Sequence, residues 1–203
     1  MALFSRTAKA AKNDTATAVQ AGRDLKHLSG DYRVDPDHSE IGFAVRHAMV
    51  ATVRGRFADF EGNLSLDGAD PSRSSAELVI KVASIDTNQE QRDEHLRTSD
   101  FFDASTFEHI AFRSTSAERL GDDAYRMTGD LTIKDVTRPV TLDLAFNGHA
   151  KDPYGNDRVG FEGVTKVNRA DWGLSYNAAL EAGGVLIGEQ VKLSFDISAV
   201  KEA

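Results

Sequence analysis

The side chains best suited to chemistry are three histidines and three charged residues: His38, His47, His95, Arg92, Asp93 and Glu94. Histidine together with a carboxylate is the usual material of general acid–base catalysis. The sequence nevertheless contains no Gly-x-Ser-x-Gly nucleophile elbow, no Gly-rich phosphate loop and no His-Glu-x-x-His. We therefore expect a protein that is not an enzyme and has no catalytic residues.

Cysteine and histidine usage limits the metal and cofactor chemistry. The chain has no Cys, which excludes disulfides, thiol catalysis and thiolate metal sites. Its six His show no metal-ligand spacing within a short segment, so we expect no metal and no required cofactor, although convergence in space stays open. His47 lies in register with Phe43 and Val45, which predicts either an inward histidine with partners in the core or a contact with a ligand head group.

One stretch of the chain predicts a short helix. Thr87 and Glu90 form a capping-box pattern, so a helix is expected over residues 88–98. Asp93 and Arg97 are four residues apart and would pair on its surface.

The composition of this helix leaves two interpretations open. With one apolar residue, Leu96, it has no stripe to bury. It could be a solvated helix that covers a sheet edge. The alternative is a structural network at the mouth of a cavity, formed by Arg92, Asp93 and His95, with Phe101 and Phe102 closing the mouth.

Apolar and polar residues alternate with a period of two from Gly30 onward. The clearest run is Val191, Leu193, Phe195 and Ile197, which alternate with polar residues as in strands with one dry face. We expect an all-β protein of roughly nine or ten short strands and one short α-helix, without βαβ units. A closed or nearly closed antiparallel β-barrel removes exposed edges, and a two-sheet sandwich is the alternative.

The interior of such a barrel is either a solid core or an apolar tunnel that holds one small ligand. Eleven Phe against one Trp and four Tyr favour an apolar lining with few polar groups. Shared parity within the strands predicts a tunnel lined by Phe43, Val45, Phe57, Phe112, Leu142, Leu144, Phe146, Phe161 and Phe195.

Charge and length predict the partners and the domain organisation. The net charge of −8 and the pI near 5.2 argue against nucleic-acid binding. Residues 1–29 are expected to form a flexible or weakly helical extension and residues 30–203 the barrel domain. The extension carries five basic and two acidic residues, a net charge of +3, so a transient contact with a membrane surface is the weaker alternative.

The N-terminus lacks a continuous apolar stretch after its first basic residue, and no apolar run reaches the length of a transmembrane helix. From the sequence alone we therefore expect a cytoplasmic protein.

Several segments together resemble the YceI-like polyisoprenoid-binding family. The central one is Ser84-Ile85-Asp86-Thr87 with Arg92-Asp93-Glu94-His95-Leu96 and Asp100-Phe101-Phe102-Asp103. The others are Tyr32-x-x-Asp35-x-x-His38-Ser39-x-Ile41-x-Phe43-x-Val45-x-His47, Gly55-x-Phe57-x-x-Phe60-x-Gly62, Thr128-Gly129-Asp130-Leu131-Thr132-Ile133, Val136-Thr137-Arg138-Pro139-Val140, Gly160-Phe161 and Asn168-Arg169-x-Asp171-Trp172-Gly173. The match runs in order from about Gly30 to Val200. Trp172 stands where the family usually has phenylalanine, and many family members are exported.

The resemblance implies an extended lipocalin-like antiparallel barrel that takes a polyisoprenoid, an isoprenoid quinone or a similar fatty lipid into its interior. It adds Phe60 and Trp172 to the expected ligand-binding residues and implies a homodimer, with roles such as lipid transport or stress response.

We therefore expect non-enzymatic binding, carriage or sequestration of a long-chain apolar lipid. The alternative is an enzyme or redox module that acts on the head group of a bound quinone-like lipid through His47 or His95. A solid-cored interaction domain would have no interior cavity.

Overall fold

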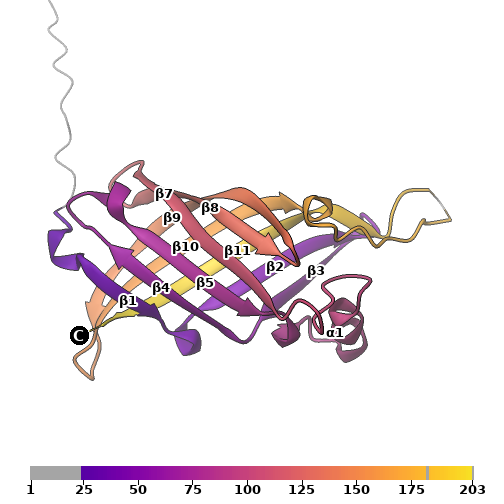
Figure 1. Cartoon of the computed structure of the whole chain (residues 1–203), viewed down its shortest axis with the longest axis horizontal. Helices are drawn as coiled ribbons and strands as arrows, with labels where there is room; N and C mark the ends of the chain where they lie inside the picture. The colour runs from indigo at the N-terminus through magenta and orange to yellow at the C-terminus, as the bar shows by residue number, and fades with distance from the viewer. Residues whose placement is uncertain (1–23, 182, 203) are drawn as a thin grey trace, which may run out of the picture.

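The computed structural model describes residues 24–181 and 183–202, and within them a single antiparallel sheet of 11 strands curls into an elongated barrel (Figure 1). The strands are β1 (Gly30–Val34), β2 (Glu40–His47), β3 (Ala51–Phe57), β4 (Phe60–Leu66), β5 (Ser75–Lys81), β6 (Ile85–Asp86), β7 (His109–Arg119), β8 (Ala124–Ile133), β9 (Val136–Lys151), β10 (Asp157–Asn168) and β11 (Ile187–Lys201). One α-helix, α1 (Glu90–Arg97), lies at one end of the barrel.

Three pairs of short strands each act as one long, interrupted strand. β1 and β2 both pair with β11, β4 and β3 pair with β1 and β2, and β5 and β6 pair with β4 and β3. The order then continues from β5 through β7, β8, β9 and β10 to β11. The sheet therefore closes on itself, which confirms the predicted antiparallel barrel.

The strands of the second half are longer than the short strands expected. β9 has 16 residues and β11 has 15, so each extends roughly 50 Å at about 3.3 Å per residue. Alternation is clear only in the middle of β9, and the ends of the strand are exposed on both faces. Backbone pairing with β8 and β10 holds these ends in the sheet, so hydrophobic periodicity does not reveal them.

Two strand glycines make room for aromatic rings inside the barrel. A Cβ added at Gly129 would lie 2.5 Å from a ring carbon of Phe112, and one at Gly55 would lie 2.4 Å from the ring of Phe43. The missing side chains therefore leave room for both rings close to the backbone of the sheet.

The barrel is closed at one end by residues that precede β1. A short 3₁₀ turn, Lys26–Leu28, places Leu25 and Leu28 in a buried cluster with Tyr32, whose hydroxyl donates to the Leu28 carbonyl at 2.9 Å. The predicted boundary at residue 30 is therefore wrong for residues 25–28, which pack on the barrel. The rest of the predicted extension, up to residue 23, lies outside the described residues.

Helix α1 begins two residues later than predicted and is capped differently. Asn88 has a φ of 57°, a left-handed conformation that cannot belong to the helix, and the Gln89 side chain accepts a hydrogen bond from the Arg92 amide. The expected Thr87–Glu90 capping box does not form, because Thr87 is buried and bonds elsewhere. No helix in the described part of the chain is both long and apolar enough to cross a membrane.

A cluster of charged side chains ties the interruption between β1 and β2 to β10. Arg158 donates to Asp35 at 2.5 Å and to Asp152 at 2.9 Å. These bonds are the main reason why the pKa of each carboxyl lies below its ordinary value.

Arg158→Met is expected to lower the free energy of unfolding at pH 7. An aspartate has a pKa of about 3.9 in an unfolded chain. Because the folded pKa values of Asp35 and Asp152 are lower, the stabilisation is complete above that value and is lost as the pH falls through the folded values. Urea denaturation at decreasing pH measures this loss. Arg113→Met, which breaks an exposed pair with Glu77, is the control and should change stability little at any pH. Equal effects of the two variants would contradict the prediction.

Candidate functional site

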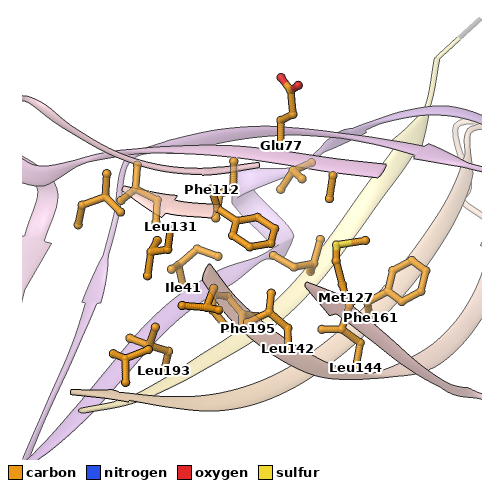
Figure 2. Close-up of a pocket in the computed structure, with 18 of the residues that line it drawn as sticks. Ile41, Glu77, Phe112, Met127, Leu131, Leu142, Leu144, Phe161, Leu193 and Phe195 are labelled. Carbon is orange, nitrogen blue, oxygen red and sulfur yellow. The ribbon is translucent and has the colours of Figure 1, made fainter. Parts of the chain in front are cut away.

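An apolar cavity of about 280 Å³ lies inside the barrel. Figure 2 shows side chains such as Phe112, Leu131 and Leu142 directed into one space, whereas the Glu77 carboxylate points away from it. Its volume is close to the lower end of the range for small-molecule sites, about 300–1,000 Å³. A solid interior would leave no such space, so the solid-cored alternative is wrong.

Most of the residues predicted to contact a ligand lie on this cavity. It is lined by all nine residues of the predicted tunnel, Phe43, Val45, Phe57, Phe112, Leu142, Leu144, Phe146, Phe161 and Phe195, and by Phe101, Phe102 and Trp172. Strand pairing aligns their inward faces: Phe161 opposes Phe146 across β10 and β9, and Leu142 opposes Met127 across β9 and β8. The period-two pattern therefore becomes one continuous apolar surface.

Two of the predicted ligand-binding residues do not line the cavity. Phe60 is buried within the main core cluster, at the start of β4, where the interruption after β3 restarts the strand. His47 is the last residue of β2 and is half-buried opposite Ile187, at the edge of the cavity lining rather than in it. Strand parity places a residue on a face but does not show where a cavity begins and ends.

Helix α1 is held by a buried network centred on Thr87. The Thr87 amide donates to Asp93 at 2.9 Å and its hydroxyl donates to the same carboxylate oxygen. Arg92 donates from Nε to the Thr87 hydroxyl at 2.7 Å and from Nη2 to the Thr87 carbonyl at 2.8 Å. Asp93 is only 6 % exposed and Thr87 only 3 %. Arg92 and Asp93 therefore meet at Thr87, a residue that the capping-box interpretation used differently. Their structural rather than catalytic role stays a prediction.

The predicted surface pair of Asp93 and Arg97 does not form. Arg97 donates instead to the carbonyls of Ala83 and Ile85, each at 2.9 Å, and so ties the end of α1 to the segment before it.

His95 belongs to a separate aromatic cluster at the α1 end of the barrel. Its ring packs edge-on against Phe101, with centroids 5.1 Å apart, and against Tyr176 at 5.0 Å. Its Nε2 lies 2.8 Å from Asp100. Phe101 lines the cavity and Tyr176 is partly exposed, so this cluster extends from the cavity lining to the protein surface. Tyr176 has no periodic neighbours in the sequence and was therefore missed.

The remaining candidates for acid–base chemistry are not brought together. His38 pairs with Asp35 at 2.9 Å in the interruption between β1 and β2, and Glu94 is exposed on α1. Among residues 24–181 and 183–202, no three metal-ligating side chains form a group that could hold an ion.

Arg169 is a charged residue on the cavity that the prediction of the lining missed. It begins a short 3₁₀ turn, Arg169–Trp172, in which the Asn168 side chain caps the Ala170 amide. Gly173, with a φ of 73°, ends the turn. Burial lowers the pKa of Arg169 from its ordinary value, although an arginine stays protonated in proteins. The motif around Arg169 was visible in the sequence, but strand parity alone gives no reason to place a cation inside.

The fold and the cavity define a closed antiparallel barrel with an apolar interior. The YceI-like domain family matches residues 32–199, and the chain belongs to that family. A UPF0312 protein of Pseudomonas putida is 37 % identical over 149 residues, which cover 72 % of this chain and 78 % of that protein.

Two solved structures share the fold. Burkholderia cenocepacia BcnA superposes with a TM-score of 0.72 at 24 % identity, over 81 % of this chain and 98 % of BcnA. A polyisoprenoid-binding domain from Saccharophagus degradans, implicated in plant cell wall breakdown, superposes with a TM-score of 0.65 at 17 % identity. That match covers 84 % of this chain and 98 % of the domain.

Proposed function

We propose that this protein binds a long-chain apolar lipid inside the barrel and carries or sequesters it without chemical change. The observation that carries the proposal is the continuous apolar lining of the cavity. Removing apolar surface from water contributes about 25 cal/mol per Å². A lipid chain that buries several hundred Å² would therefore bind tightly with few polar contacts.

A polyisoprenoid or an isoprenoid quinone is the ligand class that we favour. Family membership and the polyisoprenoid-binding description of the Saccharophagus degradans domain support this choice. The elongated barrel also suits an extended chain better than a compact ligand.

The alternative of a redox or catalytic module acting on a quinone head group has less support. It relied on His47 or His95, and neither side chain lines the cavity. We therefore prefer binding without catalysis.

The sequence predicts a transient membrane contact through the basic residues of the N-terminal extension, most of which lies outside the described residues. We propose a second contact with a membrane surface at the turn between β2 and β3. Met49 and Val50 are exposed there, Val50 by 83 %, and the Ala48 amide donates to the Leu186 carbonyl of the segment before β11. Flotation with lipid vesicles tests this contact. The homodimer and the cytoplasmic location stay predictions, to be tested by sedimentation and by cell fractionation.

The test of the proposed function is a cavity-filling substitution. Organic extraction and mass spectrometry of the purified wild-type protein are expected to find a co-purifying isoprenoid lipid. Leu144→Trp puts a bulky ring into the cavity and should lower the lipid content several-fold, with a cost of about 1–3 kcal/mol if the core is overpacked.

Ala145→Trp is the matched control, because it places the same ring on the exposed face of β9. It should keep the wild-type lipid content. Absence of lipid from the wild-type protein, together with no binding of added geranylgeraniol, would contradict the proposal.

A further inference from the structure

Arg169 is a buried cation without an ion-pair partner in the described part of the chain. Arg169 is only 7 % exposed, and its guanidinium donates hydrogen bonds to two backbone carbonyls. A buried charge is costly unless it is paired and hydrogen-bonded. The charge of Glu189 acts on Arg169, but no carboxylate of the described residues lies within ion-pair distance of the guanidinium.

The other charged residues that border the cavity are paired. Asp67 lies 3.3 Å from Arg73, Glu77 lies 2.7 Å from Arg113, and Arg126 lies 2.7 Å from Asp143. Arg169 differs from them in its burial and in having no carboxylate of the described residues within ion-pair distance, since Glu189 acts on it only from farther away.

The guanidinium of Arg169 is held in a fixed orientation. Nε donates to the Gly188 carbonyl on β11 at 3.0 Å, and Nη1 donates to the Leu174 carbonyl that follows the same turn. An arginine has five N–H donors in a rigid planar group. No described residue accepts a hydrogen bond from Nη2, so this side of the group remains for an acceptor from elsewhere.

Arg169 lies toward one end of the cavity lining. Arg169 shares the lining with Val167, Leu174 and Ile187, and Ile187 is the first residue of β11. Leu28 clusters with Ala199 near the last residue of the same strand. The two ends are roughly 40 Å apart at about 3.3 Å per residue. In Figure 1 the start of the described chain lies at the end of the barrel opposite α1.

We propose that Arg169 anchors the head group of a lipid that has a hydrogen-bond acceptor oxygen at one end. A carboxylate is expected to bind more tightly than a quinone-type carbonyl. The inference rests on the proposed lipid binding and adds the orientation and the head-group class. The lipid chain then extends from Arg169 toward Leu28. Charge-assisted hydrogen bonds are stronger than neutral ones, so the carboxylate should bind best.

The test compares ligands that share one isoprenoid chain. Delipidated wild-type protein is titrated with geranylgeranoic acid, geranylgeraniol, the matching hydrocarbon and a naphthoquinone with the same chain. The acid should bind about 10- to 100-fold tighter than the hydrocarbon, as expected for a hydrogen bond to a charged group. The quinone should bind more tightly than the hydrocarbon and less tightly than the acid, because its carbonyl oxygen accepts a hydrogen bond but carries no charge.

Arg169→Met should remove the preference for the acid over the hydrocarbon by weakening the binding of the acid. Arg169→Lys should retain part of this preference, because lysine keeps the positive charge. Arg113→Met is the control, because this arginine is exposed, pairs with Glu77 and is not among the residues that line the cavity. It should keep the full preference. A merely structural role for Arg169 would weaken all four ligands equally.

The affinities of the wild-type protein for the four ligands test the proposed anchor even if Arg169→Met does not fold. Equal affinity of the wild-type protein for acid, alcohol and hydrocarbon would overturn the anchor and leave the proposed lipid binding standing. Failure of all four ligands to bind would overturn both.

Discussion

Leu25→Ala and Leu28→Ala are each expected to lower the free energy of unfolding by about 2–5 kcal/mol, the range for large-to-small substitutions in a core. Both leucines are buried at the end of the barrel and line the cavity. The Leu28 carbonyl also accepts the Tyr32 hydroxyl, and the Gly68 amide is bonded to the Ser29 hydroxyl. This segment therefore forms part of the barrel, and its loss exposes apolar lining to water.

The measurement is urea denaturation of the purified variants. Lys26→Ala is the matched control, since Lys26 is exposed in the same short turn. It should stay within about 0.5 kcal/mol of the wild-type protein, as surface changes usually do. A flexible extension could be removed up to Gly30 with little change in stability, whereas the packing of these two leucines predicts a large loss. A loss below about 0.5 kcal/mol for the double variant would show that the segment does not close the barrel.

Asp93→Ala should destabilise the protein by about 3–5 kcal/mol, the cost of removing one partner from a buried charged network. The Thr87 amide and hydroxyl would lose their acceptor, and both groups are buried. Arg92 would still bond to Thr87, but the segment before α1 would no longer be tied to the helix. Because Phe101 follows this helix and lines the cavity, lipid should also dissociate faster from the variant.

Melting curves and lipid dissociation rates test this prediction together. Glu94→Ala is the control, because Glu94 is exposed on the same helix. Asp93→Asn, which keeps an acceptor oxygen, should lose less stability than Asp93→Ala. If Arg92 and Asp93 variants kept normal stability and lipid retention while a turnover reaction disappeared, the enzyme alternative would replace the structural role.

The inner surface of the barrel could be read from the sequence because strand periodicity is local. In β9, Leu142, Leu144 and Phe146 alternate with exposed residues, and all three line the cavity. The same reasoning fails at interruptions, where parity restarts. Phe60 follows such an interruption and lies in the core cluster outside the lining.

Local sequence patterns predicted some members of the polar network around Thr87 but not their partner. Arg92 and Asp93 were expected to serve geometry, because a short helix with one apolar residue needs polar partners. Their partner Thr87 was assigned to a capping box, since the spacing to Glu90 fits that motif. The left-handed Asn88 moves the helix start to Glu90 and leaves Thr87 for the network.

The sequence alone determined the all-β class, the antiparallel alternation and most of the apolar lining, because each depends on residues two or four positions apart. The tertiary structure decided which ends of the barrel are closed and where a charge lies inside. Leu28 meets Ala199, and Arg169 meets Gly188, only after the sheet has closed. Contacts of this kind depend on strand pairing over long separations, and no local pattern of residue types encodes them.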